Sequence, residues 1–312
     1  MRVLAAALAA LALSAHAYPT KPVRIVVPSS PGGASDLVAR LVATPLAEAL
    51  GQPFVVENRV TSGGIVGTQQ VADSAPDGHT LLVTFDTFAV NPYLYRSLKW
   101  DPVRDFAPVM ELCRYPQVLL VHPSLGVRTV REFVALAKEK GAQLNYGSAG
   151  PASSSRLAYE LFKQAAGIET VPVHYKGGGP AIQDLLAGQV QVMLIQGGGS
   201  IQQYVRTGKL VALAVSSPRR SKFYPELPAI AETYPGFATE SWVAMFAPAG
   251  TPQAVIGQLH SSLDAILQKE AAKFEAQGCE VVAGSPQELA RVVQEDQQKW
   301  RKLIQDKHIT VE

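Results

Sequence analysis

The sequence lacks blocks of like charge: its 28 Lys and Arg residues and 26 Asp and Glu residues are interspersed throughout. Without a basic block or a stripe of basic and aromatic residues, a nucleic-acid partner is not expected. After the N-terminus, the longest apolar runs, such as 210–215 (LVALAV), have the length of a strand. The six histidines are scattered, and no His, Cys or Met cluster has metal-ligand spacing, so we expect neither a metal nor a cofactor.

The first 17 residues, MRVLAAALAALALSAHA, contain one basic residue, then an Ala/Leu run, then an A-x-A sequence. This pattern is typical of a secretory signal peptide cleaved after Ala17, and the run is too short to span a bilayer. No cysteine follows the cleavage site, so a lipid anchor is not expected. We therefore expect a periplasmic protein of 295 residues with a net charge of +1.

Cysteine is also scarce, since only Cys113 and Cys279 are present. An exported protein can oxidise such a pair. The two residues lie far apart in sequence and in unlike contexts, so we expect two unpaired, mostly buried thiols.

Strand-like apolar runs alternate with helical patterns along the chain. Residues 22–28, 53–58 and 79–85 are predicted strands, whereas 65–74 and 129–141 are predicted helices. Ser35 or Asp36 is expected to cap a further helix, which ends at Gly51. Such alternation indicates βαβ units and a largely parallel sheet with helices on both faces.

Three glycines of the first half recur in the second half at offsets of 114 to 117 residues, namely Gly33, Gly51 and Gly63 against Gly150, Gly167 and Gly177. Either this is a chance alignment of a common residue, or the chain forms two similar α/β lobes.

Three loops fall at the carboxyl ends of predicted strands, where open α/β sheets bind ligands. These loops, 28–36, 84–88 and 147–155, are rich in Gly, Ser and Thr. Free backbone N–H groups, hydroxyls and the positive ends of helices suit a small anion. The first loop has neither the lysine of a P-loop nor G-x-G-x-x-G, and YGSAGP lacks the spacing of a serine hydrolase.

Several segments resemble the Bug-type receptors, the extracytoplasmic solute-binding proteins of tripartite tricarboxylate transporters. They are residues 18–82, NYGSAG (145–150), YKGGGPAIQDLLAGQVQVM (175–193), GKLVALAVSSPRRS (208–221) and PAGTP (248–252). The resemblance implies a two-lobed α/β fold of the periplasmic-binding-protein type II (Venus-flytrap) class. It also implies no catalysis and a small carboxylate ligand, held by amides and water without an arginine clamp.

On this resemblance, the chain is expected to cross between lobes near 112–121 and 242–248. Lobe I would be 18–115 plus 246–312, and lobe II would be 116–245. We expect a monomer that delivers its ligand to membrane subunits of a transporter or to a sensor kinase.

The family's ligand loops map onto particular residues of this chain. The matched positions are Pro31, Gly32, Gly33 and Asp36 in the first loop, Thr84, Phe85, Asp86 and Thr87 in the second, Ser148, Ala149, Gly150 and Ser153 in the third, and Gly177 in the fourth. Several positions depart from the family's usual residues: Ser29 and Ser30 replace an aromatic–proline pair, TSGG (61–64) replaces GAGG, Asp86 a small polar residue, Arg156 a histidine and Gln196 an acidic residue.

The small side chains of Ser29 and Ser30 suggest a pocket for a ligand bulkier than a four-carbon diacid, such as an aromatic acid. Phe85 and Phe88 are candidates for its apolar wall, although Phe88 is the more natural core residue. Asp86 either points away and caps local backbone N–H groups or pairs with a cationic nitrogen of the ligand. Arg156 is expected to point outward, which leaves neutral donors to hold the carboxylate.

The alternative function is a periplasmic enzyme on the same fold, acting on a small organic acid. It would need an acid–base pair or a nucleophile in the cleft, where Asp36 and Asp86 are the only acids expected.

Overall fold

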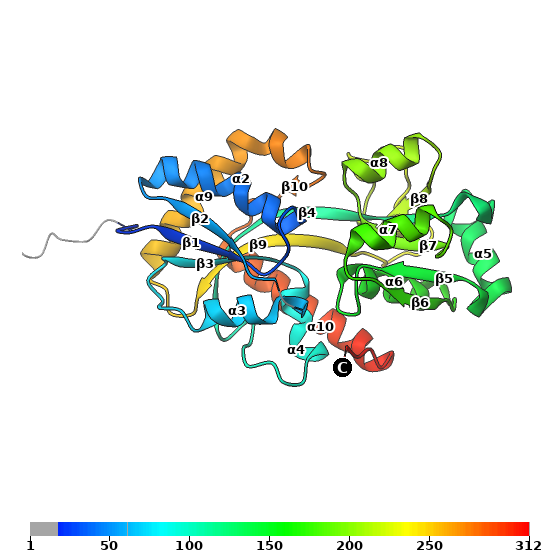
Figure 1. Ribbon diagram of the computed structural model, residues 1–312, viewed down its shortest axis with the longest axis horizontal. Coiled ribbons are helices and arrows are strands. Elements are labelled where there is room, and N and C mark those ends of the chain that lie inside the picture. Colours follow the sequence, from blue (N-terminus) through cyan, green and yellow to red (C-terminus); the bar gives the residue numbers. More distant parts are fainter. Residues whose placement is uncertain (1–17, 61, 312) are drawn as a thin grey trace, which may run out of the picture.

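The computed structural model describes residues 18–60 and 62–311, so the predicted signal peptide lies outside the described residues. Figure 1 shows two α/β halves side by side, joined by long strands that pass between them. No helix in the described part of the chain is long and apolar enough to cross a membrane.

The first half is built on three parallel strands. β1 (Val23–Val27) lies between β2 (Phe54–Asn58) and β3 (Thr80–Phe85). β1 is apolar except for Arg24, because helices cover both faces of its sheet. α2 (Ala34–Leu50) and α9 (Gln253–Glu275) pack on one face. The other face is covered by α3 (Ile65–Ala72), α4 (Thr87–Leu94) and α10 (Pro286–Asp306).

The second half repeats this plan. β5 (Asn145–Ser148) lies between β6 (Val171–His174) and β7 (Val192–Gln196), all parallel, and β8 (Val211–Val215) lies nearby. One face is covered by α5 (Val130–Lys140) and α6 (Ser154–Ala166), and the other by α7 (Gly178–Leu186) and α8 (Gly199–Arg206). Short 3₁₀ turns occur at Ser62–Gly64, Pro123–Leu125, Gly141–Gln143 and Ile230–Glu232.

Two strands connect the halves, as expected. In β4 (Phe106–Val121), residues 106–116 pair with β9 (Glu240–Pro248), and residues 117–121 pair with β7. β9 also pairs with β3, so both crossover strands are part of the first sheet. The predicted crossovers fall within these strands, and the α/β fold with two crossover strands is confirmed. The stated limits of the two lobes stay a prediction.

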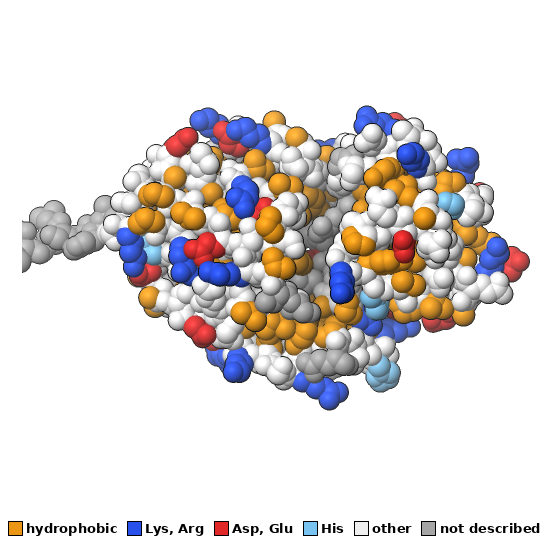
Figure 2. Space-filling model, viewed as in Figure 1, with side chains coloured by type: hydrophobic (Ala, Val, Ile, Leu, Met, Phe, Trp, Pro, Cys, Tyr) orange, Lys and Arg blue, Asp and Glu red, His pale blue; other side chains and the backbone are white. Residues whose placement is uncertain are grey.

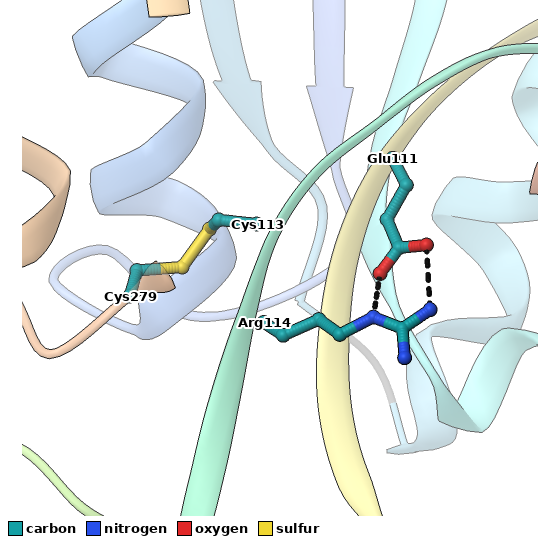
Figure 3. Close-up of a disulfide and its surroundings, with 4 residues drawn as sticks. All are labelled: Glu111, Cys113, Arg114 and Cys279. Carbon is teal, nitrogen blue, oxygen red and sulfur yellow. Dashed lines mark hydrogen bonds and ion pairs between the residues drawn. A yellow bond between two sulfur atoms is a disulfide. The ribbon is translucent and has the colours of Figure 1, made fainter. Parts of the chain in front are cut away.

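The two cysteines form a disulfide, so the expectation of unpaired thiols is wrong. Cys113 lies in β4, Cys279 follows α9, and their Cα atoms are 5.7 Å apart (Figure 3). The short strand β10 (Glu280–Val281) pairs antiparallel with β4 and brings Val281 opposite Cys113. This pairing brings together cysteines that are 166 residues apart in sequence. Both are buried, as expected.

Candidate ligand-binding site

The first loop turns sharply between β1 and α2. Gly32 has a φ of 79°, which favours glycine, and the Gly33 N–H donates to the Ser30 carbonyl at 3.1 Å. Gly33 is the N-cap of α2 and forms no side-chain cap. The expectation that Ser35 or Asp36 caps this helix is therefore wrong, because the helix begins at Ala34 and places both residues in its first turn.

Asp36 instead stabilises the loop from within the helix. Its carboxylate accepts hydrogen bonds from the Gly32 N–H at 2.8 Å, Asn58 Nδ2 at 2.9 Å and Arg40 Nε at 3.0 Å. Burial raises the pKa of Asp36, but the hydrogen bonds from Arg40, Gly32 and Asn58 together outweigh burial and lower it. Asn58 also donates to the Ser29 carbonyl at 3.0 Å, so an ionised Asp36 helps to fix the whole loop.

The second loop connects β3 to α4 and is mostly buried. Phe88 lies in the core, stacked on Trp100 with ring centroids 5.3 Å apart, as expected for a core residue. Phe85 is partly buried and packs against the core beneath α2. Thr84 and Thr87 are buried.

Asp86, in the same loop, contacts the other half of the molecule. Its Oδ1 accepts a hydrogen bond from the Ser154 hydroxyl of α6, and Ser241 of β9 is a second hydroxyl partner. Burial raises the pKa of Asp86 to about 7; the Ser154 hydrogen bond opposes this rise, and nearby Asp296 adds to it. The expected binding of local backbone N–H groups by Asp86 is present in part, through the Thr87 N–H. The contact with Ser154 of the other half was not predicted.

The third loop, between β5 and α6, is held by its own hydroxyls. Ser148 is fully buried, donates to the Gly150 carbonyl at 3.2 Å and lies 2.7 Å from His174 Nδ1. Ser153 also donates to Gly150 at 2.7 Å and accepts from the Arg156 N–H as the N-cap of α6. The Ala149 N–H donates to Ser155 Oγ at 2.9 Å. In this structure, the hydroxyls of Ser148 and Ser153 therefore shape the loop.

Arg156 is half-buried rather than pointing freely outward. Its Nη1 donates to the Pro151 carbonyl at 2.7 Å and to the Thr310 carbonyl at 3.1 Å, which corrects the expectation. Its charge adds to the effect of burial in lowering the pKa of His174. Arg156 thus links the third loop to the C-terminal segment.

The remaining predicted residues lie at the ends of β6 and β7. Gly177 has a φ of 119°, precedes α7, and its N–H donates to the Ala149 carbonyl at 3.0 Å, which joins the third and fourth loops. Gln196 ends β7, pairs with Gln117 of β4 and is half-buried.

The carboxyl ends of β1 and β3 face those of β5, β6 and β7 across the space between the halves (Figure 1). The space-filling view shows a hollow there (Figure 2). The loops 28–33, 84–88 and 147–155 contain no Lys or Arg. The helices α2, α6 and α7 begin at this edge, with N–H groups that lack partners within the helix and with positive dipole ends. This arrangement suits a small anion.

Sequence reasoning missed four polar residues around the site: Asn58, Ser154, Ser155 and Ser241. The run of three serines at 153–155 was a usable signal, since only its first member was chosen. No local pattern marked Asn58 or Ser241, because their roles arise only when separate strands are brought together.

Two α/β halves joined by crossover strands, with small-residue loops facing each other, define a two-lobed solute-binding protein. The sequence model described as "Tripartite tricarboxylate transporter family receptor" matches residues 38–309. The chain belongs to this family of receptors.

Relatives and solved structures agree with this assignment. A protein from the tcbD–tcbE intergenic region of Pseudomonas sp. (strain P51) is 36% identical over 292 residues, 92% of this chain and 87% of that protein. The periplasmic binding protein BugD is similar with a TM-score of 0.80 and 32% identity, over 94% of this chain and 99% of that one. These likenesses indicate a periplasmic location.

Two similar structures contain carboxylates. R. palustris Rpa4515 with adipate has a TM-score of 0.83 and 34% identity, over 92% of this chain and 97% of that one. MatC from Rhodopseudomonas palustris, with bound malate, has a TM-score of 0.80 and 31% identity, over 92% of this chain and all of that one.

Proposed function

We propose that this receptor holds a small organic carboxylate between its halves and delivers it to the membrane subunits of a tripartite tricarboxylate transporter or to a sensor. The observation that carries this proposal is the meeting of neutral Gly/Ser/Thr loops from both halves at the starts of α2, α6 and α7. The similar proteins with adipate and malate support a carboxylate ligand.

The carboxylate would be held by neutral donors. A hydrogen bond to a charged group contributes about 1.5–3 kcal/mol, so three or four backbone or hydroxyl donors are sufficient. Arg156 already donates to two backbone carbonyls, which supports binding without an arginine clamp. Ser29 and Ser30, smaller than the usual aromatic–proline pair, leave room for a ligand bulkier than a four-carbon diacid.

The protein acts as a receptor rather than an enzyme in this proposal. Asp36 is engaged by Arg40, Asn58 and a backbone N–H, and Asp86 by Ser154. Because both acids are already bound by other residues of the protein, a role as an acid–base pair acting on a substrate is disfavoured, and with it the enzymatic alternative. The proposal includes cleavage after Ala17, a monomer, and lobes of 18–115 plus 246–312 and 116–245.

A thermal-shift screen of the mature protein, stripped of ligand, tests the proposal. Adipate, malate, benzoate and adipamide are compared. A binding acid at about one hundred times its dissociation constant should stabilise the fold by about 2.7 kcal/mol, whereas the uncharged adipamide should have almost no effect. The bound acid should be recovered unchanged. The absence of any shift across a wider set of organic acids, or conversion of the acid, would contradict the proposal.

The donors are tested separately by substitution. Arg156→Ala should leave the affinity for the best acid within a few-fold of the parent value. Ser153→Ala should weaken binding by distorting the loop around Gly150. If Arg156→Ala abolished binding while Ser148→Ala and Ser153→Ala left it intact, the neutral-donor arrangement would be wrong.

A further inference from the structure

A buried polar network crosses the junction between the halves and includes both crossover strands. Asp86, from the first half, accepts a hydrogen bond from Ser154, at the start of α6 in the second half. Ser241 of β9 bonds to Asp86 and also accepts from Gln117 Nε2 of β4 at 3.2 Å. Asp86, Gln117 and Ser241 are all buried. The network therefore links a ligand loop to the strands about which the halves would move.

Two charged groups of α10 lie near Asp86: Asp296, whose like charge raises the pKa of Asp86, and Lys299, whose opposite charge interacts with Asp86. From α10, Asp296 faces it and accepts from Trp242 Nε1 at 2.7 Å, while Lys299 donates to the Ala238 carbonyl at 2.5 Å. Burial raises the pKa of Asp296 and lowers that of Lys299.

Farther along the crossover strands, the Glu111–Arg114 pair of β4 (Figure 3) continues this charged cluster. Glu240 of β9 also belongs to it. Arg114 is bound to Glu111 through two nitrogens and lies 3.8 Å from Glu240. The α6 contact of Asp86 is a neutral hydroxyl. Among the described residues, no cation is hydrogen-bonded to Asp86.

We propose that Asp86 is a positioning residue that couples ligand binding to uptake of one proton: when the halves close, its carboxyl takes a proton from solvent and holds the start of α6 against the first half. This inference rests on the proposed function of a two-lobed receptor. Because Ser154 directly follows Ser153, the contact also positions the third ligand loop.

The direction of the effect follows from burial. When the halves separate, Ser154 leaves Asp86, water reaches the carboxyl and the ionised form is favoured. When they close, Ser154 covers the carboxyl and excludes water; Asp296, on the same half, adds its like charge, and the protonated form is favoured. In this structure, where Asp86 contacts Ser154, the pKa of Asp86 is about 7, against an ordinary value of 3.8. The closed form is thus stabilised below pH 7, and this stabilisation is lost as the pH rises through 7.

Calorimetric titration with adipate measures this coupling. One proton taken up at a site of pKa about 7 should make the dissociation constant about tenfold larger at about pH 8 than at about pH 6. Asp86→Asn is neutral in both forms, so its dissociation constant should change little with pH and should lie below the parent value at both pH values. Adipate's own titration is common to all variants and cancels in their ratios.

Asp296→Asn is the matched control, since it neutralises a buried acid of the same cluster that is bound to Trp242 rather than to the second half. It should keep the pH dependence, shifted to lower pH. Equal pH profiles for the parent and Asp86→Asn would overturn the proposal. A profile that vanished in Asp296→Asn but persisted in Asp86→Asn would also overturn it.

A second measurement needs no ligand, so failure of the receptor function can be told apart from failure of this inference. Spin labels at Glu48→Cys in α2 and Glu139→Cys in α5, both exposed sites, report the separation of the halves. In ligand-free protein, the fraction of molecules with a short distance between the labels should be larger at about pH 6 than at about pH 8. In Asp86→Asn, this fraction should be present at both pH values. A distance distribution that did not change with pH would contradict the coupling even if adipate bound.

Discussion

Asp36 shows how one residue determines the shape of a ligand loop. Its carboxylate binds the Gly32 N–H, Arg40 and Asn58, and these bonds lower its pKa despite burial. A carboxyl whose pKa is lowered in the folded state stabilises the fold above its ordinary pKa. This contribution is lost as the pH falls through the folded-state value.

Replacing Asp36 with Asn should therefore lower the free energy of unfolding by about 1.5–3 kcal/mol at neutral pH, the range for hydrogen bonds to charged groups. The deficit should shrink in acid, where the parent carboxyl is itself protonated. Urea unfolding at neutral and acid pH measures both values, with Asp73→Asn, at an exposed position, as the control. A deficit of equal size in acid would show that charge is not the cause.

Ser29 is expected to set the width of the pocket. Its hydroxyl lies 2.7 Å from that of Ser35, so Ser29→Phe both removes this bond and adds bulk. Overpacking costs about 1–3 kcal/mol, and the affinity for benzoate, or for the bulkiest acid that binds, should fall about tenfold or more. Ser29→Ala, which removes only the bond, separates the two effects in a calorimetric titration. Equal affinities in both variants would mean that position 29 does not line the pocket.

At the scale of elements, local patterns predicted the helices well, but they did not predict the link between distant segments. The helix expected at 129–141 forms as α5, with a capping box between Thr129 and Glu132. Gly51 and Gly167, paired by the recurring offset, both end helices in the left-handed conformation. The disulfide could not be predicted, because the pairing of β10 with β4 depends on contacts between distant segments.

The disulfide attaches the segment after α9 to a crossover strand. Replacing both Cys113 and Cys279 with Ala should lower the free energy of unfolding by about 2–5 kcal/mol, because the unfolded chain gains freedom over a long loop. Urea unfolding with and without reductant checks this. The parent protein under reductant should fall to the level of the double variant, and the variant should not respond. Equal stability of the oxidised parent and the variant would contradict the expected contribution.

For the molecule as a whole, the sequence predicted the facing loops but not how the halves touch. The loops follow from strand–helix alternation, a local signal. The Asp86–Ser154 contact and the ion pairs of Lys222 with Glu275 and Glu280 depend on how the halves sit relative to each other. A single sequence does not specify that placement, so residues at the junction were missed even where the loops were correct.

Gly278 is a point where the halves meet closely. It has a φ of 77°, and a Cβ added there would lie 2.6 Å from the carbonyl oxygen of Gly197, which follows β7 in the other half. Gly208 has a φ of 69° with nothing within 4 Å of an added Cβ, so Gly208→Ala carries the backbone cost alone. That cost is about 1–2 kcal/mol.

Gly278→Ala should lower the free energy of unfolding by more than Gly208→Ala does, because the backbone of one half must move away from that of the other. The displacement of Gly197 should also disturb neighbouring Gln196 and weaken adipate binding, which Gly208→Ala should leave unchanged. Urea unfolding and calorimetric titration of the two variants measure both effects. Equal losses of stability together with unchanged adipate affinity in Gly278→Ala would show that the halves adjust freely at this contact.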